Sequence, residues 1–220
     1  MDFYGFYTGK IFDAYQYLGA HTEKTGVTFR TFAPSASRIA VIGEFNDWQE
    51  SEMNKVYDGN FWECYIPEAK PGQMYKYRIY DRNDNPVDHC DPYGFGMELR
   101  PNSASIVRDM SKYKFKDSKW MQNRSDCRKK PLNIYEIHFG SFRKPSDKTD
   151  DWYTYEEMID ILIPYLTENG YNCLEIMPLN EYPCDESWGY QATGFFSPTS
   201  RYGTADQLKA FVDACHKHGN

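Results

Sequence analysis

The sequence predicts an antiparallel β-sandwich followed by two consecutive βα units, and three features of the chain lead to this prediction. Residues 26–111 contain short runs rich in β-branched and aromatic residues, separated by turn residues, with no helical pattern between them. Residues 131–220 instead contain two apolar runs, each with an amphipathic helical pattern after it. Between these regions, residues 113–130 are rich in Lys, Arg and Asp, which is typical of a linker. We therefore expect a sandwich domain over residues 21–112 and a separate βα domain over residues 131–220.

The sandwich strands are expected in four short runs. They are Val27–Ala33, Arg38–Gly43, Phe61–Ile66 and Met74–Tyr80. In the last run Tyr75 and Tyr77 share one face and Lys76 and Arg78 the other, so one face should be buried. Residues 1–20 are expected to be a helical lead-in, with a short helix over Ile11–Leu18 that Gly19 ends.

The βα region has clear start and stop signals. Strands are expected over Leu132–Phe142 and Tyr171–Pro178. The first helix should begin at Thr154, which forms a capping box with Glu157, and Pro164 should kink its last turn. The second helix, residues 205–218, has an equivalent box in Thr204 and Gln207, and Gly219 closes it.

The composition restricts the partners of the chain. A net charge of −7 without any Lys/Arg-rich run argues against nucleic acid and anionic membranes. Aromatic residues make up 17% of the chain and 19 of them are Tyr, which favours a neutral polymer with apolar faces and hydroxyls. There is no signal-peptide or membrane-span pattern, and the six dispersed cysteines include no CxxC pair, so a cytoplasmic protein is expected. Cys173 and Cys215 should be core residues, and neither a metal nor a cofactor is expected.

The segment from Asn180 to Thr204 is the most informative part of the chain. It follows the second expected strand and precedes the last helix, a position that faces the active site in a barrel. Its six rings are Tyr182, Trp188, Tyr190, Phe195, Phe196 and Tyr202. Flat apolar rings beside Asn, Gln, Asp and Glu suit a sugar ligand, and the alternative for each ring is packing of the loop against its own domain.

Two groups of motifs resemble a known family. SWGYQATGFFSPTSRYGT, read with the upstream EIMPLNEYP, resembles the loop after the second barrel strand of the 1,4-α-glucan (glycogen) branching enzymes of the α-amylase superfamily. GEFNDW, NFWECYIP and GQMYKYRIYD resemble their starch-binding sandwich module. The resemblance implies an immunoglobulin-like β-sandwich followed by the first two βα units of an incomplete (β/α)8 barrel, because a closed barrel takes about 250 residues. It also implies that the chain is the N-terminal part of a longer enzyme.

The same resemblance implies which residues bind substrate. Tyr190 stands where the family's Tyr stacks on the sugar at the cleavage point, and Trp188 and Gln191 beside it are further candidates. In the sandwich, Trp48 and Lys76 match positions that can contact α-glucan. The alternatives are that the sandwich only braces the barrel and that Lys76 is merely solvated. Trp62 is expected in the core.

No catalytic residue is expected within the chain. Retaining transfer of an α-1,4 segment to a 6-hydroxyl needs two carboxylic acid side chains, and those of the family lie beyond Asn220. Asp185 and Glu186 occupy the aromatic loop but match neither catalytic motif, and His138 either lines the cleft or is structural. The chain alone is therefore expected to be inactive. Two alternatives stay open, namely a non-catalytic α-glucan-binding module and part of a debranching or trehalose-releasing hydrolase.

Overall fold

The computed structural model describes residues 1–124 and 129–219, which form two compact units. The first unit contains residues 1–109 together with 192–197. The second contains residues 110–191 together with 198–219.

The first unit is a β-sandwich, as predicted from the strand runs. One antiparallel sheet has the order β1 (Gly19–Thr22), β2 (Val27–Phe32), β6 (Phe61–Ile66), β5 (Asn54–Val56). The other has the order β4 (Ser51–Glu52), β3 (Arg38–Gly43), β7 (Met74–Tyr80), β8 (Pro86–His89), with β9 (Ser105–Ile106) also paired to β7. Side chains from both sheets share one core, which includes Phe29, Val41, Trp62 and Tyr77.

Strand β7 has the predicted alternation, and its inward side carries a buried acid. Tyr75 and Tyr77 are fully buried, and their hydroxyls donate to Oδ2 of Asp91 at 2.7 and 3.1 Å. The Tyr93 N–H donates to the other oxygen at 2.8 Å. Burial outweighs these three donors and raises the pKa of Asp91 to about 6.

The N-terminal lead-in differs from the prediction. Its helix is α1, Phe3–Tyr7, capped by the Asp2 carboxylate, and Ile11–Leu18 holds only a single 3-10 turn, Ala14–Gln16. The predicted helix is wrong because its apolar residues do not share one face. Ile11 and Leu18 join the cluster around Phe61, whereas Tyr15 packs beside Phe196 with ring centroids 5.8 Å apart.

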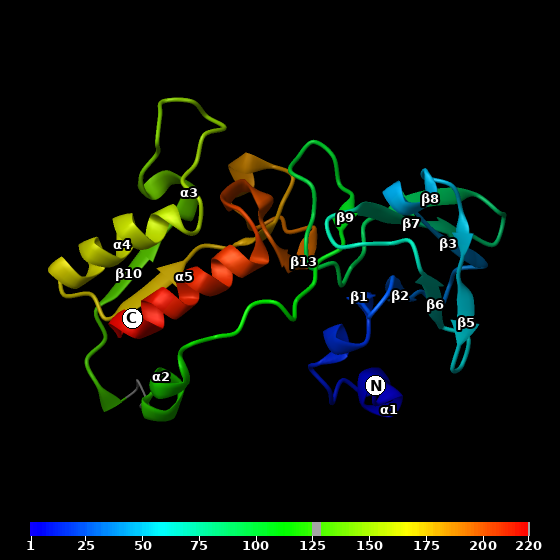
Figure 1. Cartoon of the computed structure of the whole chain (residues 1–220), viewed down its shortest axis with the longest axis horizontal. Coiled ribbons are helices and arrows are strands. Elements are labelled where there is room, and N and C mark those ends of the chain that lie inside the picture. The colour runs from blue at the N-terminus through cyan, green and yellow to red at the C-terminus, as the bar shows by residue number, and fades with distance from the viewer. Residues whose placement is uncertain (125–128, 220) are drawn as a thin grey trace. The chain divides into compact units, whose positions relative to one another are not determined.

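The second unit contains two βα units. Strands β10 (Ile134–Ile137) and β11 (Cys173–Ile176) are parallel partners in register from Ile134–Cys173 to Ile137–Ile176. Helices α4 (Glu157–Glu168) and α5 (Ala205–His218) lie side by side next to β10 (Figure 1). Their apolar faces and the two strands form the core of this unit.

The first predicted strand is too long. Its second half is the short helix α3, Phe139–Phe142, in which the amides of Ser141 and Phe142 both donate to the His138 carbonyl at 3.1 Å. The chain turns here because Phe139 inserts between Tyr155, Tyr202 and Phe211.

Both predicted capping boxes are present. The Thr154 N–H donates to Glu157 at 2.7 Å and the Glu157 N–H donates back at 3.2 Å, although regular helix begins only at Glu157. Thr204 and Gln207 make the corresponding pair at α5. Gly219 ends α5 in the left-handed conformation, with φ of 85°.

Residues 113–124, which the sequence predicts to be a linker, instead contact α5. They contain helix α2 (Ser118–Asn123), and its Trp120 stacks on His216 with ring centroids 3.7 Å apart. Asp117 lies 2.8 Å from Nδ1 of the same histidine, and the Tyr113 hydroxyl donates to Asp213. The rest of the predicted linker includes Cys127, which lies outside the described residues, as does Asn220.

Two further short strands, β12 (Asn180–Glu181) and β13 (Gly194–Pro198), lie in the aromatic segment after β11. The five described cysteines are free thiols; Cys215 is buried, as predicted, and Cys173 is half-buried.

Candidate functional site

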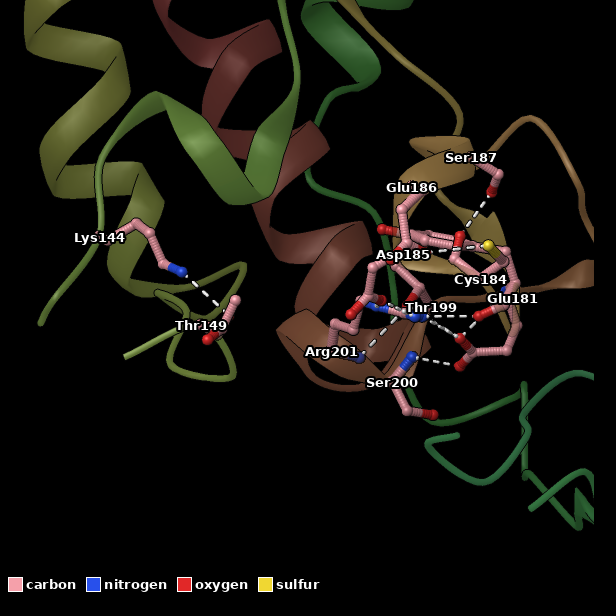
Figure 2. A network of polar contacts seen from close by, with 11 residues as sticks. Lys144, Thr149, Glu181, Cys184, Asp185, Glu186, Ser187, Thr199, Ser200 and Arg201 are labelled. Atoms are coloured by element: carbon pink, nitrogen blue, oxygen red, sulfur yellow. Dashed lines mark hydrogen bonds and ion pairs between the residues drawn. The ribbon is translucent and has the colours of Figure 1, made fainter. Parts of the chain in front are cut away.

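The aromatic loop of the second unit is built around the buried guanidinium of Arg201. Figure 2 shows Arg201 between Glu181 and Asp185, with Thr199 and Ser200 beside it. Nη1 of Arg201 lies 2.9 Å from Oε1 of Glu181 and also donates to the Tyr182 carbonyl at 2.8 Å. Nε donates to Oδ1 of Asp185 at 3.1 Å. One cation therefore joins the two ends of the loop.

Glu181 completes this network from the other side. Its carboxylate accepts from the Thr199 hydroxyl at 3.0 Å and from the Ser200 N–H at 2.6 Å. The side chains of Arg201 and Glu181 are 1% and 3% exposed, so the pair is shielded from solvent. Removal of Glu181 would leave the buried Arg201 with Asp185 as its remaining carboxylate partner, and removal of Arg201 would leave Glu181 as a buried charge without its cation, so both changes should be destabilising.

The six rings of the loop divide into packing and exposed groups. Tyr182 and Tyr202 are buried, and the Arg201 guanidinium lies 3.8 Å from the Tyr182 ring centroid. Phe196, which like Phe195 belongs to the first unit, stacks on Tyr93 with centroids 4.9 Å apart and is still 40% exposed. The remaining three, Trp188, Tyr190 and Phe195, are 56%, 64% and 70% exposed. Packing therefore explains the two buried tyrosines and part of the Phe196 surface.

Trp188 and Tyr190 are held outward by an unusual backbone. A 3-10 turn, Asp185–Ser187, precedes Trp188, whose φ of 55° is left-handed. Gly189 follows with φ of 91°, and a Cβ there would lie 2.4 Å from the Pro178 carbonyl oxygen. Only glycine fits this close approach, so the backbone between the two aromatic residues is restricted to this conformation. Gln191 is exposed next to them.

His138 lies beside the exposed rings. Its ring centroid is 5.9 Å from that of Trp188, and Nδ1 is 2.9 Å from the Ser141 hydroxyl. Partial burial, with a smaller effect of the Arg201 charge, lowers the pKa of His138. A neutral imidazole therefore stands next to Trp188 at pH 7.

Asp185 and Glu186, the two consecutive acidic side chains of this loop, have structural partners. Asp185 is ion-paired with Arg201, and the Cys184 thiol lies 3.1 Å from Oε2 of Glu186. These contacts give Asp185 a role in holding the loop.

The second candidate position is Trp48, in the first unit. The side chain of Asn46 locks its loop by accepting from the Gly43 N–H at 2.9 Å and donating to the Val41 carbonyl at 3.1 Å. Asp47 and Trp48 then both adopt left-handed conformations, with φ of 51° and 59°. The indole is 39% exposed. Trp62, in contrast, is 3% exposed and its Nε1 donates to the Ala33 carbonyl at 3.1 Å, which confirms its core position.

Lys76 lies at the same end of the sheet as the Trp48 loop, because it pairs with Ile42 at the end of β3. Its neighbours on the outer face of β7 are already engaged: Arg78 pairs with Asp88 at 2.8 Å, and the Arg38 guanidinium lies 3.6 Å from the Tyr80 ring centroid. The Tyr80 ring is therefore covered, whereas Trp48 is 39% exposed. Within the first unit the structure brings Trp48 and Lys76 to one end of a sheet.

Sequence reasoning missed Arg201 and Glu181. Their separation of 20 residues follows no periodic pattern, and the available signal was a single Arg in a strongly aromatic segment. Among residues 1–124 and 129–219, no group of three His, Cys, Asp or Glu side chains is arranged to hold a metal ion. Within the same residues, no helix is long and apolar enough to cross a membrane.

Comparisons with known proteins agree with the motifs. Residues 17–94 match carbohydrate-binding module 48, described as the isoamylase N-terminal domain. The chain is 44% identical, over 99% of its length, to the 1,4-α-glucan branching enzyme GlgB of Fusobacterium nucleatum. It is 45% identical, over 98% of its length, to GlgB of Dechloromonas aromatica. A crystal structure titled putative α-amylase from Salmonella typhimurium superposes with a TM-score of 0.73 and 26% identity, covering 92% of this chain and 32% of that one.

The resemblance to branching enzymes is thus confirmed over nearly the whole chain. The chain spans about a third of the length of these curated relatives, 36% and 35%.

Proposed function

We propose that this chain is the N-terminal part of a 1,4-α-glucan branching enzyme that acts in the cytoplasm in glycogen biosynthesis. Such an enzyme cleaves an α-1,4 glucan and transfers the segment to a 6-hydroxyl with retention. The observation that carries the proposal is the 44–45% identity to two branching enzymes over at least 98% of the chain. The partner of the chain is α-glucan.

The second unit represents the first two βα units of a (β/α)8 barrel. The adjacent parallel strands β10 and β11, each followed by a helix, support this assignment. The chain spans 36% and 35% of the length of the two branching enzymes, and in the proposed enzyme the remaining barrel strands belong to further chain that corresponds to the rest of that length. The two catalytic carboxylic acid side chains lie in that further chain.

Within this enzyme the second unit contributes substrate contacts. Tyr190 stacks on a sugar ring, and Trp188 and Gln191 extend the contact surface. Support comes from the 64% exposure of Tyr190 and from the Arg201 network, which holds the loop ends without using either ring. A ring that is already positioned loses little conformational entropy on binding.

The first unit contributes a separate α-glucan contact through Trp48 and Lys76. The exposed indole can cover one face of a pyranose, and the ammonium group can donate to hydroxyls. The locked loop around Asn46 and the match to carbohydrate-binding module 48 support this role. The same observations favour the second candidate function, a module that binds α-glucan without cleaving it.

The deciding experiment compares the 220-residue chain with the product of the complete coding sequence. Both are incubated with amylose, and new α-1,6 linkages are measured by NMR together with the iodine spectrum. Branching by the longer protein and none by the chain alone would support the proposal. A coding sequence that ends at Asn220, or a longer product that binds glycogen without forming α-1,6 linkages, would favour the binding module.

A further inference from the structure

The turn between β5 and β6 exposes a tyrosine in an unusual conformation. Tyr57 follows β5 directly, is 66% exposed and has φ of 57°. A bulky aromatic residue rarely adopts this left-handed conformation, which Asn and Gly tolerate well. Gly59, two residues later, also has a positive φ of 86°. The backbone conformation of this turn therefore does not favour a tyrosine, and the role of the side chain must lie in its ring.

Helix α1 holds that ring in place. Phe3 stacks on Tyr57 with ring centroids 4.1 Å apart and an interplanar angle of 6°. Phe3 is itself anchored edge-on against the fully buried Phe61 at 4.9 Å. The ring of Tyr57 is therefore backed on one face by Phe3, with Phe61 at 6.3 Å, and the residue is still 66% exposed.

Polar groups lie next to this ring in a fixed arrangement. The Tyr7 hydroxyl donates to Oδ2 of Asp58 at 2.6 Å and accepts from the Asn60 amide at 2.9 Å. The same amide lies 3.1 Å from the Asp58 carboxylate. The hydrogen bond from Tyr7 lowers the pKa of Asp58, which keeps the carboxylate ionised at neutral pH. Each of these groups lies at the surface and retains capacity for further hydrogen bonds.

We propose that Tyr57, with the Tyr7–Asp58–Asn60 cluster, forms a second α-glucan contact on the first unit, separate from Trp48 and Lys76. The flat backed ring takes one pyranose face, and the carboxylate and amide bind the hydroxyls at its rim. A neutral polyhydroxylated ligand fits this mixture better than an anion, because a carboxylate lies at the centre of the cluster. The inference rests on the proposed α-glucan binding of the first unit. Two separated contacts would let one module hold two turns or two branches of the same polymer and raise its avidity.

The test uses the whole 220-residue chain and Tyr57→Asn. Asn tolerates the left-handed conformation, so this substitution removes the ring without straining the turn. We expect a nearly unchanged melting temperature of the first unit, because relief of the left-handed tyrosine offsets the lost stacking on Phe3. The apparent association constant for glycogen, measured from retardation in glycogen-containing gels, should fall roughly fivefold to tenfold, on the scale of one aromatic stacking contact. Tyr57→Trp should retain the retardation.

The matched control is Tyr65→Ala, which removes another exposed tyrosine of the same sheet, 46% exposed. It should leave glycogen binding unchanged. Addition of maltoheptaose should shift the NMR signals of the Asn60 side-chain amide in the parent chain and not in Tyr57→Asn.

The outcomes separate this inference from the proposed function. If Trp48→Ala weakens glycogen binding and Tyr57→Asn does not, the first unit binds glucan and the second contact is refuted. A parent chain that glycogen does not retard would overturn the Tyr57 contact and the proposed contact at Trp48 and Lys76, whereas the proposed branching activity is tested separately by the formation of α-1,6 linkages. A change in sedimentation with no change in glycogen binding would identify the Tyr57 surface as a protein contact and also overturn the inference.

Discussion

Arg201 and Glu181, 20 residues apart in the chain, form an ion pair of 2.9 Å in which both side chains are at least 97% buried. Both residues belong to the loop that exposes Trp188 and Tyr190. Because Asp185 binds the same guanidinium, Arg201 joins two acidic residues of the loop, Glu181 and Asp185. Buried electrostatic contacts therefore hold the loop that carries the candidate glucan contact.

Glu181→Ala should destabilise the second unit by about 3 kcal/mol, since it leaves Arg201 buried with Asp185 as its remaining carboxylate partner. Urea unfolding measures this loss, followed through NMR amide signals of α4 and α5 for this variant and of β3 and β7 for the control, which lies in the first unit. The control is Glu52→Ala, which removes one of the carboxylate partners of Arg38 in an exposed pair with side chains 35% and 58% accessible and leaves Glu50 at 2.8 Å. That change should cost less than about 1 kcal/mol. Equal losses in the two variants would contradict the structural role of the Arg201 network.

The sequence predicted the parts of the fold that local patterns encode. Strands β3, β6 and β7 have the bounds expected from their β-branched and aromatic runs, and the Thr204 capping box lies where expected. These features depend on residues that are near one another in the chain. The apolar run before Phe142 misled the prediction, because a short apolar run fits a strand and a buried helical turn equally well.

The candidate sites were only partly predictable. Motifs identified Trp48 and Tyr190, and the exposure of both rings fits a ligand contact. Arg201 and Tyr57 could not be found in this way, because their partners become neighbours only after folding. Helix α2 was not predicted because the charged residues around it indicated a linker, although its Trp120 stacks on His216.

The buried Asp91 should make the first unit lose stability as pH rises. Its pKa in the folded chain, about 6, lies above the ordinary value of 3.8, so the folded state binds the proton more tightly between these values. The stabilisation is fully present below about pH 4 and is lost as pH rises through about 6, a change of about 3 kcal/mol. Urea unfolding at pH 4 and pH 7, followed through amide signals of β7, measures it as the difference between the parent chain and Asp91→Asn.

As a control, Asp81 should give a pH dependence of stability with the opposite sign. Asp81 is exposed, and hydrogen bonds from Asn85 lower its pKa. The parent chain should therefore gain stability relative to Asp81→Asn as pH rises through the range of that carboxyl. A difference between the parent and Asp91→Asn that does not change with pH would show that Asp91 titrates normally.

The two tryptophans of the sandwich should respond differently to truncation. Trp62→Ala removes a buried indole and leaves the Ala33 carbonyl without its donor, so it should cost about 3–5 kcal/mol and lower the melting temperature by roughly 10 °C or more. Trp48→Ala removes an exposed ring and should leave the melting temperature nearly unchanged while it weakens retardation by glycogen. Calorimetry and glycogen-containing gels measure both. Unfolding of the sandwich by Trp48→Ala would make Trp48 a packing residue.

Gly189→Ala should disturb the loop that presents Trp188 and Tyr190. The residue has φ of 91°, and a new Cβ would lie 2.4 Å from the Pro178 carbonyl oxygen, which belongs to the backbone and has little room to move. The matched control is Gly170→Ala, where φ is 73° and a new Cβ would have no atom within 4 Å. Gly170→Ala should lower the free energy of unfolding only by the cost of placing alanine in the left-handed conformation, about 1 kcal/mol. We expect faster hydrogen exchange across residues 180–191 in Gly189→Ala, measured by mass spectrometry, and little change there in Gly170→Ala. If both variants exchange alike in this segment, the close approach of Gly189 to Pro178 does not hold the two rings in place.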